Sequence, residues 1–273
     1  MSTHSDRALT DHYEKASEKD RLSGHWGQLE YVRTKSIIQT YLPEPPAKIL
    51  DIGGASGIYS CWLAKLGYEV YLVDPVPKHI DQARDASGLQ PESPLAGIEL
   101  GDARKLSQDD GFADIILLLG PLYHLIHPPD RMSALSESCR VLKPGGLLFG
   151  GGISRFASCI DGFMSGYFKD RPFQKIMNQD LKDGQHRNTT DNPLYFMDTF
   201  FHHPDELRTE IESAGFKAIS LHAVEGIGYM MADFEENWRV ESYRKLLLDI
   251  VSKTDTEASL IGASPHLLCV ASK

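Results

Sequence analysis

The sequence has little of several features that define particular classes of protein. Only 4 cysteines occur in 273 residues and none forms a C-x-x-C pair, so a disulfide framework is not indicated. No apolar run reaches the roughly 18 residues that a membrane span needs, and the first residues lack the apolar core of a signal peptide. We therefore expect a cytoplasmic protein without membrane contact.

Positive charge is also scarce. The 28 Lys and Arg residues against 38 Asp and Glu residues give a net charge of −10 with His neutral. Because a domain that binds the phosphate backbone is normally basic, we expect no nucleic-acid partner. The 41% of hydrophobic and 24% of charged residues are ordinary for a soluble globular protein. A monomeric or homodimeric enzyme is the expectation that remains.

Apolar strand-like runs and amphipathic helix-like runs alternate between residues 47 and 150. The fourth apolar run, residues 113–120, is continuously apolar, which is typical of a central parallel strand covered on both faces. This rhythm predicts right-handed βαβ crossovers and a doubly wound α/β sheet. The expected strands of this part are 47–53, 69–74, 97–102, 113–120 and 147–152.

The chain on either side of this region is expected to complete the fold. Residues 1–46 predict an N-terminal helical segment that covers the site, and 47–273 form the main domain. Residues 155–201 lose the sheet period, so we expect a helical insertion after the fifth strand, lying over the carboxyl ends of the strands as a substrate cap. A sixth strand at 217–224, a helix near 234–252 and a seventh strand at 266–272 follow.

A glycine-rich turn separates the first strand from the helix that follows it. Gly53, Gly54 and Gly57 let the backbone approach a ligand where a Cβ would collide. The N–H groups at the start of the helix favour an anionic or carboxylate-bearing ligand. Glycine turns also occur as plain connections between a strand and a helix. The turn alone therefore does not distinguish a ligand-binding site from such a connection.

Two acidic residues at the ends of neighbouring strands strengthen the case for a cofactor. Asp74 ends the second strand and lies 74 − 53 = 21 residues after Gly53, close to the spacing of an acid that binds ribose hydroxyls. Asp102 ends the third strand, where it can accept from an adenine amino group. Open α/β sheets bind ligands at this edge. An adenosine-containing cofactor is therefore indicated.

Three cofactor classes compete for this site. A P-loop is excluded because the chain has no Gly-Lys-Ser or Gly-Lys-Thr string, and the glycine spacing is shorter than the G-x-G-x-x-G of nicotinamide sites. S-adenosylmethionine fits better, since it has two ribose hydroxyls, no phosphate and a compact amino-acid tail. An NAD(P)-dependent oxidoreductase remains the rival from another enzyme class.

The stretch from Lys48 to Gly152 resembles the class I S-adenosylmethionine-dependent methyltransferases, in particular their small-molecule branch. Five motifs appear in the family's order. They are the first motif Asp51–Gly57, the ribose acid Asp74 with Pro75, the adenine-contacting loop Gly101–Ala103, the fourth motif Leu119–His124, and the turn Arg140–Gly146.

The resemblance implies S-adenosylmethionine as cofactor, S-adenosylhomocysteine as product, and a Rossmann-like seven-stranded sheet whose last strand is antiparallel. It also implies that the N-terminal segment contacts the cofactor or the substrate through Tyr13 and Arg33. The expected cofactor-binding residues are Asp51, Gly53, Gly54, Gly57, Asp74, Pro75, Asp102, Ala103, Leu119, Gly120, Tyr13 and Arg33.

The end of the fourth strand carries the expected catalytic residues. His124 is the candidate general base because imidazole titrates near neutrality, and Tyr123 beside it would orient the substrate. A structural role for His124 is equally compatible with the sequence. The aromatic residues of the insertion would either line an apolar acceptor pocket or form a core. No metal site is expected, because adjacent residues such as His202 and His203 seldom reach one ion.

These observations predict a methyltransferase that acts on N or O of a small-molecule acceptor. The chain has Leu-Gly-Pro-Leu-Tyr-His where methylators of nucleic-acid and protein amides typically have Asp/Asn-Pro-Pro-Tyr. That departure disfavours RNA and protein as acceptors, although a methyltransferase acting on either remains the second rival.

Overall fold

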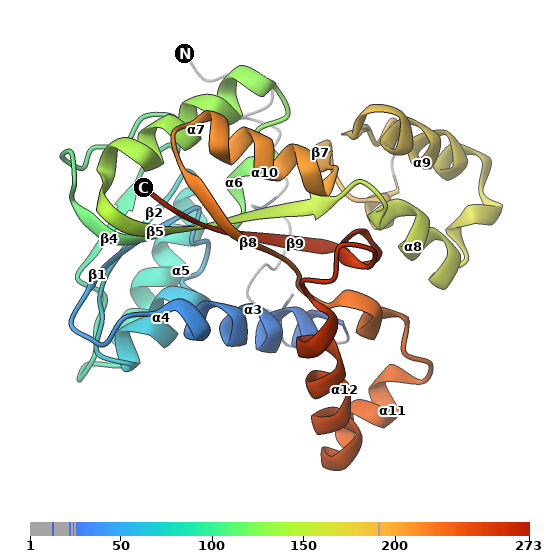
Figure 1. Cartoon of the computed structure of the whole chain (residues 1–273), viewed down its shortest axis with the longest axis horizontal. Helices are drawn as coiled ribbons and strands as arrows, with labels where there is room; N and C mark the ends of the chain where they lie inside the picture. Colours follow the sequence, from blue (N-terminus) through green and yellow to red (C-terminus); the bar gives the residue numbers. More distant parts are fainter. Residues whose placement is uncertain (1–12, 14–21, 23, 25, 191) are drawn as a thin grey trace.

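The computed structural model describes residues 13, 22, 24, 26–190 and 192–273. Its centre is a twisted sheet flanked by helices on both faces (Figure 1). The strands are β1 Lys48–Ile52, β2 Glu69–Asp74, β3 Gly97–Leu100, β4 Ala113–Leu118, β5 Leu142–Ser154, β6 Gln185–His186, β7 Thr199–His202, β8 Lys217–Ala223 and β9 His266–Ser272. The helices are α3 Gly27–Tyr41, α4 Ile58–Lys65, α5 Pro77–Gly88, α6 Pro121–His124, α7 Pro128–Val141, α8 Ala157–Met164, α9 Arg171–Asp183, α10 Pro204–Ser213, α11 Phe234–Arg239 and α12 Glu241–Thr254.

Strand order confirms the predicted doubly wound sheet. The strands β3, β2, β1, β4 and β5 lie side by side in that order and are all parallel. The chain therefore runs outward from β1 to β3 and then returns to place β4 on the other side of β1. Such a reversal of direction opens a crevice at the carboxyl ends of the strands, and open α/β sheets bind their ligands there.

The last strand is antiparallel, as the resemblance implied. Strand β9 pairs with β5 from Leu147↔Ser272 to Ile153↔His266, and its other edge pairs with β8. Because β9 runs against the parallel strands, its first residue lies at the same sheet edge as their carboxyl ends. This reversal brings the start of β9 to the rim of the crevice.

Two apolar layers explain why the helices cover both faces. Helices α3, α4 and α5 contribute Ile38, Leu63 and Ile80 to the core on one face, while α7 and α10 contribute Leu135 and Leu207 to the core on the other. Strand β4 is buried nearly along its whole length between these layers, as its continuous apolar sequence predicted.

The insertion after β5 is only partly helical. Helices α8 and α9 were expected, but Thr199–His202 form strand β7, which pairs with β5 at Ile153↔Phe201 and Ser154↔His202 and with β6 on its other side. Strand β4 pairs with β5 only up to Gly150, so β7 continues the sheet along an edge that would otherwise lack a partner. The sheet of the described residues thus has two strands more than predicted.

Two further differences concern helices. The helix expected near residues 234–252 is divided into α11 and α12, because the backbone of Val240 is extended between them. Helix α3 accounts for part of the helical segment expected in residues 1–46, and the rest of that prediction falls outside the described residues. In the part of the chain that the structure describes, every helix is too short or too polar to cross a membrane.

A buried arginine joins α7 to α10 beneath the loop that follows α6. Arg131 is 1% exposed; its Nε and Nη2 atoms donate to the Glu210 carboxylate, at 2.7 Å for the shortest contact, and Nη1 donates to the carbonyl oxygens of Leu125 and Ile126. Burial alone would raise the pKa of Glu210, but hydrogen bonds from His202 and Arg131 outweigh it and lower that pKa to about 2.

Replacement of Glu210 by Gln should lower the free energy of unfolding by about 2 kcal/mol at pH 7, because it leaves the Arg131 charge buried without its counter-ion. The folded pKa of Glu210 is depressed, so its contribution is complete above about pH 4.5 and is lost as the pH falls toward 2. Urea unfolding should therefore show a difference between wild type and Glu210→Gln that narrows from pH 6 to pH 3. The exposed residue Glu92 provides a control, Glu92→Gln, with almost no effect.

Candidate active site

A cavity of about 500 Å³ lies at the carboxyl ends of β1, β2 and β4. The volume is within the range of pockets that bind small molecules. Its wall continues from the turn after β1 to the end of β4, and then to the start of β9. The crevice that the strand order opens is therefore a real cavity lined by side chains.

The glycine turn forms one side of this cavity. The backbone of Gly53 is left-handed (φ +72°), and a Cβ at this position would lie 2.8 Å from Cγ of Pro121. A Cβ on Gly54 would lie 2.8 Å from Oδ2 of Asp51. Both positions thus require glycine because the turn packs closely against its neighbours. Gly57, also left-handed at φ +81°, precedes α4 and completes the turn.

Asp74 binds the turn to the second strand. It is 4% exposed; Oδ2 accepts from the backbone N–H of Ala55 at 2.9 Å, and Oδ1 accepts from the N–H of Val76 at 2.9 Å. His79 Nδ1 lies 3.0 Å from Oδ1. A carboxylate oxygen has two acceptor directions, so Oδ2 retains a position for a ligand hydroxyl.

Asp51 is the second buried carboxylate of the turn. Its Oδ2 accepts from the Ser60 hydroxyl at 2.6 Å. Burial raises the pKa of Asp51 to about 7, the Ser60 hydrogen bond opposes this shift, and the nearby charge of Asp74 adds to it. The proton occupancy of Asp51 therefore changes near neutral pH, in a side chain that lines the cavity.

The acidic residue after the third strand, Asp102, is paired with an arginine. Asp102 and Ala103 line the cavity, but the Asp102 carboxylate accepts from the Arg104 guanidinium, with a shortest distance of 2.6 Å. The Asp102 side chain is 43% exposed, so this ion pair lies at the cavity mouth. An adenine amino group would have to share the carboxylate with Arg104.

The end of β4 forms the part of the wall next to the glycine turn. Leu119 and Gly120 lead into the short helix α6, which ends in Tyr123 and His124. The Tyr13 hydroxyl lies 2.9 Å from His124 Nε2, and the Tyr13 ring packs edge-on against His79 at 5.0 Å between centroids. Tyr13 thus lies between α5 and α6 at the cavity wall, and its contact with cofactor or substrate stays a prediction.

Comparison with known proteins decides the family. A family model described as "Methyltransferase domain" matches residues 50–150. The ubiquinone/menaquinone biosynthesis C-methyltransferase UbiE of Chromobacterium violaceum is 32% identical over 185 residues, which are 66% of this chain and 70% of that protein. The chain belongs to the class I S-adenosylmethionine-dependent methyltransferases.

Solved structures agree with this class I methyltransferase fold. A structure described as an S-adenosylmethionine-dependent methyltransferase from Methanosarcina mazei aligns with a TM-score of 0.59 at 21% identity, covering 87% of this chain and 96% of that one. A protein from Pyrococcus horikoshii aligns with a TM-score of 0.60 at 16% identity, covering 96% and 98%. At these identities the likeness concerns the fold alone.

The residues of the cavity fit the donor that class I methyltransferases use. The Ser56 hydroxyl is buried in the cavity wall and has no hydrogen-bond partner within the described residues, so a polar ligand would satisfy it. The carboxylate of Asp74 suits ribose hydroxyls, and the carboxylate of Asp51 suits an ammonium group. S-Adenosylmethionine presents all of these groups.

The structure brings nearly all of the sequence-predicted site residues to this cavity. The predicted residues among those that line it are Tyr13, Asp51, Gly53, Gly54, Asp74, Pro75, Asp102, Ala103, Leu119, Gly120, Tyr123 and His124. Gly57 and Arg33 do not line it. Gly57 acts through the conformation of the turn, as described above.

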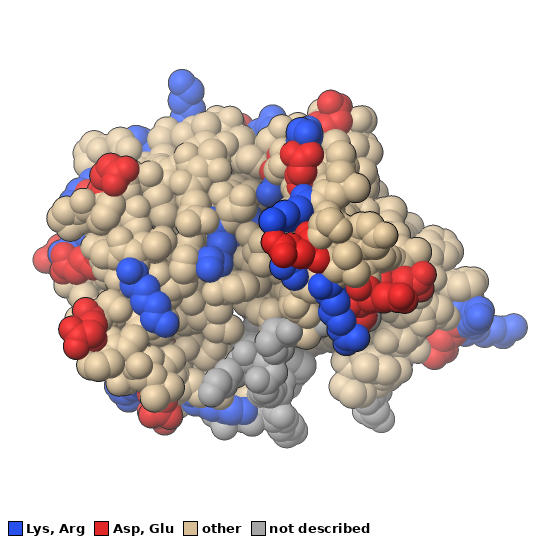
Figure 2. Space-filling view, turned by 90° about the horizontal axis from the view of Figure 1, so that it is seen from below, with Lys and Arg blue, Asp and Glu red and all other residues tan. Residues whose placement is uncertain are grey.

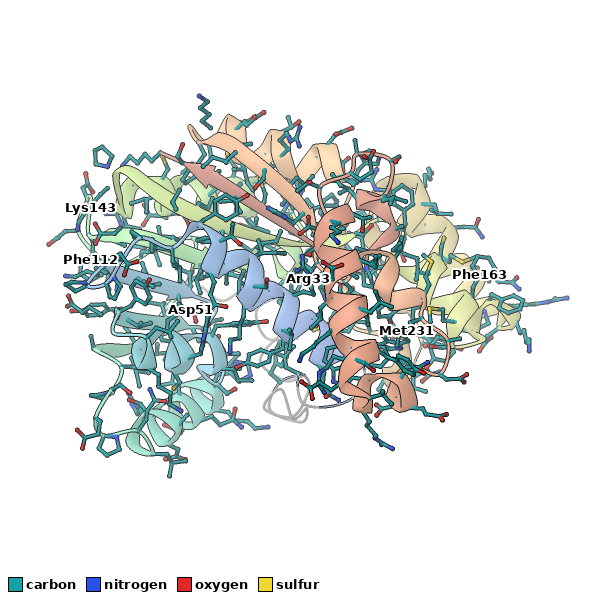
Figure 3. All side chains as sticks on the ribbon, turned by 60° about the horizontal axis from the view of Figure 1, so that its bottom comes forward. Arg33, Asp51, Phe112, Lys143, Phe163 and Met231 are labelled. Carbon is teal, nitrogen blue, oxygen red and sulfur yellow. The ribbon has the colours of Figure 1, made fainter. Side chains whose placement is uncertain are left out.

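Arg33 occupies a position that differs from the expected contact with cofactor or substrate. It is 3% exposed, and its Nη2 donates to Oδ2 of Asp255 at 2.6 Å where α3 meets the end of α12 (Figure 3). His222 Nδ1 lies 3.0 Å from the same carboxylate oxygen. Nothing in the sequence links Arg33 to Asp255, so Arg33 was expected at the site, whereas its geometry is that of a structural ion pair.

The aromatic residues of the insertion lie apart from the cavity. Phe173 and Tyr195 pack with Ile176 in a core that belongs to the insertion itself. Phe163 is 63% exposed at the outer end of α8 (Figure 3). Of the two readings that the sequence left open, the structure therefore supports a core for Phe173 and Tyr195.

Sequence reasoning missed cavity residues outside the motifs. Glu30 and Thr34 of α3 and His266 of β9 line the cavity. The antiparallel last strand was expected, and its direction implies that the first residue of β9 reaches the cavity edge. That direction is the signal that would have identified His266.

The raised pKa of Asp51 should make stability fall as the pH rises. Between about pH 4 and pH 7 the folded state holds a proton on Asp51 that the unfolded chain has released, so this group reduces stability by up to about 1.4 kcal/mol per pH unit. Asp51→Asn, which keeps an acceptor for Ser60, should gain stability relative to wild type over that interval. Urea unfolding at pH 5 and pH 8 measures the change. An equal difference between the two proteins at both pH values would contradict the assignment.

Proposed function

We propose that this methyltransferase transfers the methyl group of S-adenosylmethionine to N or O of a small-molecule acceptor bound in the same cavity. The observation that carries the proposal is the continuity of the cavity, which reaches from Asp74 past the glycine turn to His124 and His266. A cavity of about 500 Å³ has room for a donor and a small acceptor together. A macromolecular acceptor would have to insert a single base or side chain into this cavity.

The surface charge supports a small acceptor as well. On the face seen from below, Lys and Arg side chains alternate with Asp and Glu side chains and form no broad basic area (Figure 2). The net charge of the whole chain is −10. Binding of RNA through its phosphates would favour a basic surface.

The chain's residues divide between holding the donor and directing the acceptor. Asp74 would accept from the ribose hydroxyls, Ser56 would bond a polar group of the donor, and Asp51 would face its ammonium group. The donor supplies a methyl group on a positively charged sulfur, which leaves as a neutral thioether. The protein therefore needs to orient the acceptor and exclude water, and such orientation contributes roughly 7–11 kcal/mol in well-aligned reactions.

His124 and Tyr123 would act on the acceptor. Their rings lie 4.6 Å apart at the end of β4, where both line the cavity. His124 Nε2 would accept a hydrogen bond or a proton from the attacking group, exchanging its bond with the Tyr13 hydroxyl for one with the acceptor. A general base of this kind contributes about 10²–10⁴-fold in rate.

Transfer to carbon is a second candidate. The relative from Chromobacterium violaceum and another from Neisseria meningitidis, 30% identical over 182 residues, are both described as C-methyltransferases. The two candidates give different products. A methyl group on carbon resists the reagents that cleave a methyl ether, and its NMR chemical shift differs from that of a methyl group on nitrogen or oxygen. Product analysis by mass spectrometry and NMR separates them.

The test is transfer of radiolabel from S-adenosylmethionine carrying a labelled methyl group. Purified protein is incubated with pooled small amines, pooled phenols, bulk RNA or a protein extract. We expect label in a small-molecule pool. Label confined to RNA or protein would overturn the proposal. With the labelled acceptor, His124→Asn should lower kcat about 100-fold while leaving the Kd of S-adenosylhomocysteine unchanged, and the exposed His127→Asn serves as the control.

Removal of the charge on Asp74 should weaken donor binding. Asp74→Asn keeps a carbonyl oxygen for the Ala55 N–H but loses charged hydrogen bonds, so the Kd of S-adenosylhomocysteine should rise about 10- to 100-fold, or about 1–3 kcal/mol. Isothermal titration calorimetry measures the affinity, with Glu92→Gln as the control. Unchanged affinity, with the fold intact by circular dichroism, would remove Asp74 from the donor site.

A further inference from the structure

The insertion after β5 exposes apolar side chains at its outer end. Phe163 and Met164, in the last turn of α8, are 63% and 43% exposed, and Phe168, in the 3₁₀ helix Tyr167–Lys169, is 36% exposed. The rings of Phe163 and Phe168 lie 5.4 Å apart, so they form one patch. Figure 3 shows Phe163 at the edge of the molecule. Adjoining exposed apolar residues, unlike scattered single ones, are typical of a contact surface. We call Phe163, Met164 and Phe168 the apolar tip.

Cations lie beside and behind this apolar tip. Lys169 follows Phe168, and its Nζ lies 5.7 Å from the centre of the Phe168 ring. Helix α9 begins two residues later and carries Arg171, Lys175 and Lys182, all exposed. These positions are 175 − 171 = 4 and 182 − 175 = 7 residues apart, so the three side chains share one face of α9, opposite the face that the helix buries. We call them the basic face of α9.

The basic face of α9 adjoins the apolar tip. Gln174 is three residues after Arg171 and one before Lys175, so it lies beside both on the first two turns of the helix. Its Nε2 donates to the carbonyl oxygen of Phe168 at 2.8 Å. This bond ties the start of α9 to the segment that carries Phe168. A flat partner that reaches the apolar tip therefore also reaches the start of the basic face.

The charge of this end is positive although the whole chain is acidic. Residues 163–183 expose four Lys and Arg side chains and two Asp side chains, a difference of 4 − 2 = +2, against −10 for the chain. The two acids stand at the ends of α9 and are bonded within the insertion. Asp170 accepts from the Tyr195 hydroxyl, and Asp183 accepts from the Gln179 amide and the Gln185 N–H. Among the described residues, the four cations form no salt bridge.

We propose that the apolar tip and the basic face of α9 bind the surface of a membrane that contains anionic lipids. Phe163 and Met164 would enter between the headgroups, while the Lys and Arg side chains would contact phosphate oxygens. The expectation of no membrane contact rested on the lack of a spanning run, but a surface contact needs only exposed apolar side chains flanked by cations. The proposal goes beyond the function proposed above and does not depend on it.

The position and the charge of the surface favour a membrane over other partners. In Figure 1, α8 and α9 form the end of the molecule opposite β1, so the apolar tip projects outward. A projecting tip suits entry between lipids, whereas single-stranded nucleic acid is held in a groove. A second copy of this chain that met the same surface in a two-fold contact would bring like charges together. Anionic headgroups complement the basic face.

The first test is binding to vesicles and needs no turnover. The protein is sedimented with vesicles of phosphatidylcholine alone or of phosphatidylcholine with phosphatidylglycerol, and the bound fraction gives a partition coefficient. We expect a partition coefficient at least about 10-fold higher for the anionic vesicles. The difference should shrink between 0.1 M and 0.5 M salt, because salt screens the attraction. Equal binding to both kinds of vesicle, or to neither, would overturn the proposal.

A single substitution tests the apolar tip. Phe163→Ser should lower the partition coefficient about 10-fold, because a large apolar side chain no longer leaves water. The matched control is Leu246→Ser on α12, since Leu246 is a similarly exposed apolar residue (59%) outside the insertion. Circular dichroism checks that both variants keep the fold. An equal loss in both variants, or none in Phe163→Ser, would contradict the assignment of the tip.

A second set of variants tests the basic face. Replacing Arg171, Lys175 and Lys182 together by Gln should lower the partition coefficient for anionic vesicles about 100-fold, because each cation at such a surface contributes about 5-fold. The exposed residues Lys245 and Lys253 of α12 provide the control, Lys245→Gln with Lys253→Gln, which should change it little. An effect of the control as large as that of the triple variant would mean that overall charge, and not this face, governs binding.

Fluorescence tests whether the apolar tip enters the lipid. Phe163→Trp adds a tryptophan to the 3 of the natural chain and keeps an apolar ring. Lipids brominated on their acyl chains should therefore quench this variant more than wild type, and should not do so for Leu246→Trp. Two further results would overturn the proposal. One is single-stranded RNA bound through the basic face without binding of vesicles, and the other is a dimer that Phe163→Ser dissociates, again without binding of vesicles.

Discussion

The hydrogen bond from the Ala55 N–H to the Asp74 carboxylate, at 2.9 Å, is the contact on which the site's geometry depends. It joins the turn after β1 to the end of β2 and holds Ala55 in a left-handed conformation (φ 48°) that costs a non-glycine residue about 1 kcal/mol or more. Gly53 extends this junction, since its N–H donates to the Val73 carbonyl at 2.7 Å. These contacts within the protein fix the turn that lines the cavity.

The direction of β9 has an equally large effect on the rest of the cavity. If the last strand were parallel, its first residue would lie at the opposite edge of the sheet. Antiparallel pairing with β5 places His266 opposite Ile153, near the carboxyl end of the sheet. The same pairing brings Glu225, at the end of β8, next to His266. One topological feature thereby assembles a histidine–carboxylate pair from residues that are 41 positions apart.

The sequence predicted those parts of the structure that depend on local patterns. Continuous apolar runs, such as Ala113–Leu118, identify the strands because burial on both faces requires them. The glycine turn and Asp74 were found because a close backbone approach and a strand-end acid have fixed spacings. Helix α10 begins at Pro204, because proline is compatible with the first helical turn.

Features that depend on distant partners were beyond prediction. Arg33 was assigned to the cavity because nothing in the sequence links it to Asp255, 222 residues away. The strand Thr199–His202 was read as part of a helical insertion because its pairing depends on where β4 ends. His266 was passed over since its partner, Glu225, lies in another strand connection. In each case a long-range contact, and not local propensity, determines the role of the residue.

The central claim is that the donor lies along the glycine turn, with the acceptor between it and the start of β9. A crystal structure of the protein with S-adenosylhomocysteine bound tests this most directly. We expect the ribose hydroxyls on Asp74, the amino-acid tail at the glycine turn, and the part of the cavity between the sulfur and His266 open to an acceptor. Ligand density elsewhere, or an amino-acid tail that fills the space beside Glu225 and His266, would contradict it.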